Sequence, residues 1–161
     1  MRPEGVPAMA KKPPSPRSPK SASRRRVGPR SGSAAATPLR GLGIDVIEVD
    51  RIEAMLVQHP TRFLERVFTA AEVAHSAGRR NRAQHLAARF AAKEAAMKAL
   101  GTGLSSGVTW HDFAVETDAA GKPHLVVTGK GAAIARRAGI GAWSVSLTHT
   151  RTHAAAVVVA Q

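Results

Sequence analysis

The stretch from Arg82 to Leu100 constrains the fold more than any other part of this 161-residue chain. It is rich in Ala, Arg, Lys, Glu and Met and contains neither glycine nor proline, which predicts one long helix. The helix should end at Gly101-Thr102-Gly103, because glycine readily adopts the left-handed conformation that terminates helices. We therefore expect this helix to be the central element of the fold.

The residues after this helix alternate between apolar and polar in the manner of strands. Two strands, a small helix and the two strands of a final hairpin are expected over 110–117, 124–128, 130–138, 142–148 and 153–160. No repeats are visible. The pattern predicts an α+β class, with the long central helix against a small antiparallel sheet.

Before the long helix, the sequence predicts one strand and three short helices. Residues 41–47 (GLGIDVI) form the strand, and alternation places Leu42, Ile44 and Val46 on one face and Asp45 on the other. Helices are expected over 49–58, from Pro60 through Val67, and from the capping box of Thr69 and Glu72 to about Gly78.

The first 38 residues differ from the rest of the chain. Residues 1–40 hold ten Lys or Arg and one acid, so they carry +9 of the formal net charge of +13. Their Pro, Ser and Arg content predicts a disordered basic extension over 1–38 and a folded domain over 39–161. A transit peptide, opposed by eight prolines, and a tether to acidic surfaces or nucleic acid through Arg24-Arg25-Arg26 are the alternatives, and Met9 could be the true start.

Two bulk features exclude classes of structure. The chain has no cysteine, which excludes disulfides and thiolate metal sites. It also has no run of about 18 uncharged apolar residues, so no membrane span is expected.

Two acids are candidate metal ligands. Asp45 lies within an apolar strand, where a carboxylate is costly unless it is paired or bound to a metal. Glu94 shares a helical face with Phe90 and Met97 and precedes Lys98 by four residues. An exposed or capping Asp45 and a surface Glu94–Lys98 pair are the simpler interpretations, but two carboxylates from separate elements also suit Mg²⁺ that is completed by phosphates and water.

Cationic and small residues near these acids could contact phosphates. Arg89, Lys93 and Lys98 lie on the long helix, with Arg89 and Lys93 facing one way and Lys98 about 140° further round. The glycines around Thr102 would let a polyanion approach the backbone. His149 closes a strand and could bind ligand, although a lone histidine in a hairpin is more often structural.

Read together, the motifs GIDVIEVDRIE, FTAAE, RFAAKEAAMKALGTG and SVSLTHTRTHAAAVVVA resemble the holo-acyl-carrier-protein synthase family over nearly all of residues 41–161. The resemblance implies the 4′-phosphopantetheinyl transferase fold. It implies that Asp45 and Glu94 hold Mg²⁺ against the pyrophosphate of coenzyme A while a serine of apo-acyl carrier protein attacks the β-phosphate. The products would be holo-carrier protein and adenosine 3′,5′-bisphosphate. Lys98 would assist proton transfer or stabilise the leaving phosphate, with a water on the metal as the alternative base.

The same resemblance implies further roles. The residues expected to bind coenzyme A are Arg89, Lys93, Gly101, Thr102, Gly103 and His149. Arg51 is expected to contact the acidic carrier protein. A cytoplasmic enzyme of lipid metabolism is implied, usually a homotrimer with active sites between subunits, so one site could draw residues from two chains.

Two other classes of function fit the sequence less well. A nucleic-acid-binding protein would be expected to interleave basic residues with aromatics in its folded part, yet the chain has no tyrosine and only 4% aromatic residues. A carrier-binding module without catalysis would be expected to lack Asp45, Glu94 or Lys98, and all three are present.

Overall fold

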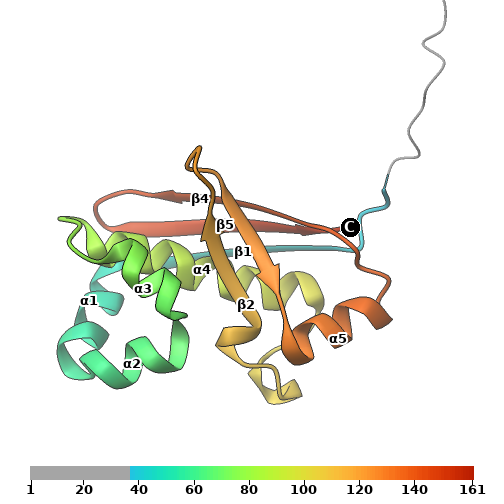
Figure 1. Ribbon diagram of the computed structural model, residues 1–161, viewed down its shortest axis with the longest axis horizontal. Coiled ribbons are helices and arrows are strands. Elements are labelled where there is room, and N and C mark those ends of the chain that lie inside the picture. Colours follow the sequence, from blue (N-terminus) through green and yellow to red (C-terminus); the bar gives the residue numbers. More distant parts are fainter. Residues whose placement is uncertain (1–36) are drawn as a thin grey trace, which may run out of the picture. The chain divides into compact units, whose positions relative to one another are not determined.

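The computed structural model describes residues 37–161, and the expected N-terminal extension lies almost wholly outside them. Four helices follow the first strand before the chain returns to strands (Figure 1). In chain order the elements are β1 (Gly41–Glu48), α1 (Val49–Gln58), α2 (Pro60–Val67), α3 (Ala70–Ser76), α4 (Arg82–Leu100), β2 (Phe113–Thr117), β3 (Pro123–Val127), α5 (Gly129–Arg137), β4 (Trp143–His149) and β5 (His153–Ala160), with short 3₁₀ turns at Leu104–Ser106 and Trp110–Asp112.

The strands form two antiparallel sheets. One has the order β1-β5-β4, so the last strand of the chain pairs with the first, and the other is the hairpin β2-β3. In the larger sheet Asp45 lies opposite Ala156, which lies opposite Leu147 on β4. The α+β class and the antiparallel pairing of the final hairpin are confirmed.

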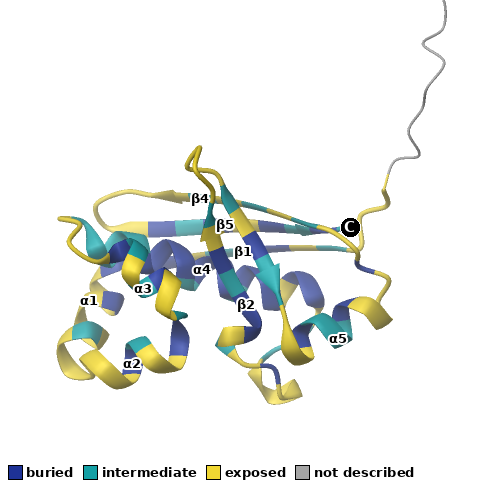
Figure 2. Cartoon of the chain, viewed as in Figure 1, coloured by how far each residue is buried: buried dark blue, intermediate teal, exposed yellow. Residues whose placement is uncertain are grey.

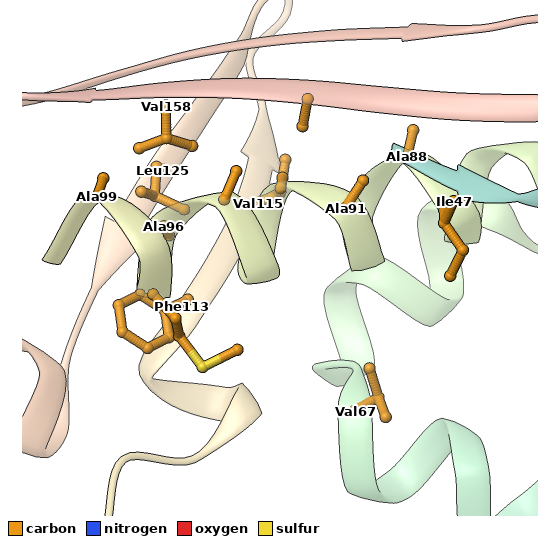
Figure 3. Packing of buried hydrophobic residues seen from close by; sticks show 14 of the residues in the cluster. Ile47, Val67, Ala88, Ala91, Ala96, Ala99, Phe113, Val115, Leu125 and Val158 are labelled. Atoms are coloured by element: carbon orange, nitrogen blue, oxygen red, sulfur yellow. The ribbon is translucent and has the colours of Figure 1, made fainter. Parts of the chain in front are cut away.

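Helix α4 forms the centre of the core and runs beneath the larger sheet (Figures 1 and 2). Its alanines lie against β5, and Figure 3 shows Ala91 and Ala99 directed at the strand while Val158 points back at the helix. Alanine side chains are short, so the helix and the sheet can approach closely. The alanine-rich composition of this helix therefore sets the spacing of the layers.

Strand β1 approaches α4 even more closely, and two glycines make this possible. A Cβ atom on Gly41 would lie 1.9 Å from the carbonyl oxygen of Ala99, and one on Gly43 would lie 1.9 Å from that of Ala95. No real Cβ atom tolerates such a contact, so only glycine fits at either position. Asp45 is the next residue on the same face of the strand, and it is thereby held against α4.

The opposite face of β1 is apolar and has no cover in the described chain. Leu42, Ile44 and Val46 are 61%, 60% and 59% exposed, and Val157 of β5 beside them is 38% exposed. The alternation expected from the sequence is thus observed, but the face that packs in the core is the one with the glycines and Asp45.

Most elements lie within a few residues of their expected positions. One correction concerns residues 110–117, where the strand begins only at Phe113 and Trp110–Asp112 forms a 3₁₀ turn. The turn is stabilised by a capping box in which Thr109 and Asp112 exchange hydrogen bonds. Hydrogen bonds of this kind, between a side chain and the nearby backbone, compete with the hydrogen bonds between strands.

No helix among residues 37–161 is both long and apolar enough to cross a membrane.

Candidate active site

Asp45, Lys98 and Glu94 lie together where β1 crosses α4. The Lys98 Nζ donates to Asp45 Oδ1 at 2.8 Å and to the carbonyl oxygen of Ile44 at 3.1 Å. The Asp45 side chain is 15% exposed and that of Lys98 is 52% exposed, so the pair is open to solvent on the lysine side. A solvent-accessible ammonium group can leave this carboxylate when another cation or a phosphate arrives.

Glu94 is close enough to Asp45 for the two carboxylates to repel each other. Burial raises the pKa of Glu94, the charge of Asp45 raises this pKa further, and the ammonium of Lys98 lowers it. Two acids held in one place at an energetic cost are characteristic of a functional site rather than of a stabilising contact.

The donor set of this site fits a hard divalent cation. Among residues 37–161 no three His, Cys, Asp or Glu side chains cluster as metal ligands, so the site offers two carboxylates only. Zinc sites require three or four protein ligands, whereas Mg²⁺ is commonly held by one or two carboxylates plus substrate phosphates and water. Asp45 and Glu94 therefore fit Mg²⁺ that arrives with a phosphorylated substrate.

Lys93 has a different role from the one expected. Its side chain is 0% exposed, and its ammonium lies 2.9 Å from Glu72 and donates to the carbonyl oxygens of Trp110 and Phe113. Three partners use all three of its N–H donors, so Lys93 has no donor left for a ligand phosphate. The buried pair joins α3 to α4, and we remove Lys93 from the candidate site.

Arg89 lies on the other flank of α4 from Glu94. The two residues are five positions apart, which separates their directions by about 140° around the helix. Arg89 donates to Thr117 at the end of β2 and lines a cavity of about 350 Å³ with His149 and Leu147 of β4. The residues expected at one site thus form two groups in a single chain, one beside β1 and one beside β4.

The Gly101-Thr102-Gly103 segment ends α4 as expected. Gly101 has φ 69°, the left-handed conformation, and nothing lies within 4 Å of a Cβ placed on Gly101 or Gly103. The hydroxyl of Thr102 is buried without a hydrogen-bond partner among the described residues. The segment has open space around its glycines and one unused polar atom, as an anion-binding loop requires.

Arg51 lies on α1 beside an apolar groove of about 340 Å³. The groove is lined by Ile47, Arg51, Ile52, Ala54, Met55, Phe63 and Phe90. An exposed cation at the edge of an apolar groove suits an acidic, amphipathic protein surface.

Comparison with known proteins decides the family. Residues 41–158 match the model of the 4′-phosphopantetheinyl transferase superfamily. The holo-[acyl-carrier-protein] synthase of Solidesulfovibrio magneticus is 50% identical over 121 residues, which cover 75% of this chain and 97% of the relative. The chain belongs to the holo-[acyl-carrier-protein] synthase family.

Solved structures of holo-[acyl-carrier-protein] synthases share this fold. The enzyme from Neisseria meningitidis superposes with a TM-score of 0.70 at 30% identity, covering 77% of this chain and 99% of that one. The enzyme from Bacillus anthracis, in complex with CoA (3′,5′-ADP), has a TM-score of 0.63 at 35% identity, covering 76% of this chain and 96% of that one.

Several residues that shape the candidate site are not apparent as site residues from the sequence. Gly41 and Gly43 bring β1 onto α4, and their spacing before Asp45 in the pattern G-x-G-x-D was the available signal. The sequence indicates Glu72 only as part of a helix cap, although its side chain also pairs with Lys93 and accepts a hydrogen bond from the backbone N–H of Val115.

Proposed function

We propose that this synthase transfers the 4′-phosphopantetheine moiety of coenzyme A to a serine of apo-acyl carrier protein in a Mg²⁺-dependent reaction. The observation that carries the proposal is the meeting of Asp45, Glu94 and Lys98 at the crossing of β1 and α4. Two carboxylates and one ammonium form the set of charges that phosphoryl transfer from a pyrophosphate requires.

In the proposed reaction the serine Oγ forms a bond to the β-phosphorus and the bond to the bridging oxygen breaks. Adenosine 3′,5′-bisphosphate leaves, and the serine proton is lost to the surrounding water. Mg²⁺ held by Asp45 and Glu94 would supply charge neutralisation at the pyrophosphate. Lys98 already acts as a hydrogen-bond donor in an ion pair, which favours stabilisation of the leaving phosphate over service as a base.

The nucleotide end of coenzyme A needs cations and open backbone. We assign it to Arg89 and His149, which line one cavity, and to the segment from Gly101 to Gly103. Because Arg89 and Glu94 lie on opposite flanks of α4, one chain does not bring these groups to a single ligand.

An assembly of several copies could bring Asp45 and Glu94 of one chain near Arg89 and His149 of another. We propose that this assembly is a homotrimer, as the resemblance to the family implies. The exposed apolar face of β1 and β5 supports self-association, since large exposed apolar patches mark interfaces. The carrier protein would dock at the groove beside Arg51, near the residues that hold the metal.

The first test is transfer itself. Apo-carrier protein, coenzyme A and Mg²⁺ are incubated with the enzyme, and intact mass spectrometry should show the carrier protein gain one phosphopantetheine arm on a serine. EDTA should stop the reaction.

Asp45→Ala and Glu94→Ala should each lower kcat/KM by about 100-fold or more, because charge stabilisation by a metal supplies several kcal/mol. The exposed acid Glu53 gives a control, and Glu53→Ala should keep wild-type turnover.

The pH dependence gives a second readout of the same site. Because burial and the charge of Asp45 raise the pKa of Glu94, protons compete with Mg²⁺ for this carboxylate more strongly than for an ordinary glutamate as the pH falls. The Mg²⁺ concentration that gives half the maximal rate should therefore rise as pH falls. If Asp45→Ala or Glu94→Ala turned over as fast as the wild type at limiting Mg²⁺, the proposed role of that carboxylate as a metal ligand would be refuted.

A further inference from the structure

The cavity beside Arg89 holds a row of three histidines, two of which have no role in the proposed reaction. His85 of α4 lies between His75 of α3 and His149 of β4. The ring centroids are 6.1 Å apart between His75 and His85 and 5.6 Å apart between His85 and His149, and both pairs are edge-to-face. Three separate elements thus bring three imidazoles to one side of a cavity of about 350 Å³.

The charged residues that line this cavity are all basic. Arg79 and Arg89 line it together with the three histidines, and no carboxylate does. The remaining lining residues are Ala88, Thr117, Gly121, Pro123 and Leu147.

The acids nearest to this row are already engaged or lie in an adjoining space. Glu72 on α3 is paired with Lys93, and Asp118 on the β2–β3 turn accepts from His124 and from turn amides. Glu116 of β2 lines a separate adjoining cavity with His75 and Arg89. The histidine row therefore faces arginines and other imidazoles and lacks a counter-charge in its own cavity.

Arg89 gives this cavity the character of a built site. The residue is 4% exposed, and its Nη1 and Nη2 donate to the carbonyl oxygen of His85 and to Thr117. Its Nε is buried and has no acceptor among the described residues. A buried donor without a partner is rare in folded proteins and is satisfied when a ligand supplies an acceptor.

The surroundings also favour the neutral form of two of the three imidazoles, those of His75 and His85. Burial lowers the pKa of His75 and of His85, and the charges of Arg79 and Arg89 lower both further. A bound anion would reverse the electrostatic part of this effect, because an opposite charge nearby favours the protonated imidazole.

We propose that the row His75–His85–His149 makes this cavity a proton-linked site for a phosphate monoester, so that ligand binding draws protons onto His75 and His85. The inference rests on the proposed function, in which Arg89 and His149 hold the nucleotide end of coenzyme A, and it adds His75, His85 and Arg79 to that pocket. The pyrophosphate is assigned to the metal, so the 3′-phosphate monoester is the remaining anion of this substrate. Affinity for the nucleotide end should therefore increase as pH falls through the neutral range.

The test is calorimetric titration of the full-length enzyme with adenosine 3′,5′-bisphosphate between about pH 8 and pH 6.5, the range in which histidines change charge. Titrations in buffers of different ionisation enthalpy count the protons taken up. The wild type should take up protons, and its Kd should tighten by as much as about tenfold per pH unit for each proton gained. His75→Gln with His85→Gln keeps polar side chains that do not titrate, and it should lose most of this uptake and flatten the pH dependence of Kd.

Controls separate the protein from the ligand. The phosphate monoester itself titrates near pH 6, but it does so in both proteins and cancels in the difference between them. His59→Gln alters an exposed histidine at the α1–α2 junction and should behave as the wild type. In the unaltered enzyme, NMR should show the His75 and His85 resonances titrating at higher pH once the bisphosphate is bound, which tests the idea without any variant.

The outcomes are distinguishable. Bisphosphate binding with a proton count equal in wild type and double variant would overturn the inference and leave the proposed function standing. Inorganic phosphate that binds as tightly and with the same uptake would overturn the assignment to the nucleotide end. No binding of the bisphosphate by the wild type at any pH would remove both the inference and the proposed function of this pocket.

Discussion

Two lysines of one helix show how burial decides the role of a residue. Lys93 is fully enclosed and paired with Glu72, whereas Lys98 is half exposed and reaches Asp45. Removing one partner of a buried pair leaves an uncompensated charge and costs about 3–5 kcal/mol, whereas an exposed pair contributes about 0–1 kcal/mol. Lys93→Met should therefore lower the free energy of unfolding strongly, and Lys98→Met should abolish transfer with little loss of stability.

Urea unfolding and the transfer assay check this contrast. The double variant Lys93→Met with Glu72→Gln removes both charges, so it should recover part of the lost stability. A Lys93→Met enzyme as stable as the wild type would contradict the structural role given to the pair. The sequence could not distinguish these lysines. Helical spacing gives the side of the helix on which each lysine lies, but it does not show which side packs against a buried acid such as Glu72.

At the scale of elements, the sequence predicted nearly every helix and strand, since each has its own local signal. Thr69 and Glu72 cap α3 with both reciprocal hydrogen bonds, as expected. The sequence did not reveal which face of β1 packs in the core. The apolar side chains of Leu42, Ile44 and Val46 would suggest that their face is the buried one. Instead, Gly41 and Gly43 allow the opposite face of the strand to reach the α4 backbone. The nearness of Asp45 to Glu94 follows from this contact, which no local pattern contains.

The glycine contact between β1 and α4 can be tested by adding one methyl group. In Gly43→Ala the new Cβ would meet the carbonyl oxygen of Ala95 at 1.9 Å, and backbone atoms on both elements must move apart. We expect a loss of about 1–3 kcal/mol of stability, the usual cost of overpacking, and a large fall in kcat as Asp45 moves from Glu94. Gly141→Ala is the matched control, since nothing lies within 4 Å of its Cβ. Thermal melts and the transfer assay give the two values, and a fully active Gly43→Ala enzyme would show that the close approach is dispensable.

At the scale of the whole molecule, one chain presents an apolar sheet face and two separate groups of candidate site residues on different flanks of α4. Packing of copies through β1 and β5 would account for both features. It would bury the apolar patch and would bring one chain's cations near another chain's carboxylates. The side chain of Ile44 points away from Asp45, so a change there alters the face without touching the proposed metal ligands.

Ile44→Glu should therefore yield a folded monomer that has lost most transfer activity. Ile44 is 60% exposed in the single chain, so the glutamate stays in water and the fold should hold, whereas a charge in an apolar interface between copies is strongly unfavourable. Light scattering after size exclusion gives the mass, and circular dichroism checks the fold. Val57→Glu places the same charge on α1 at an 81% exposed position and should remain assembled and active. A monomeric wild type with full turnover, or an active Ile44→Glu monomer, would show that each chain builds a complete site from its own residues.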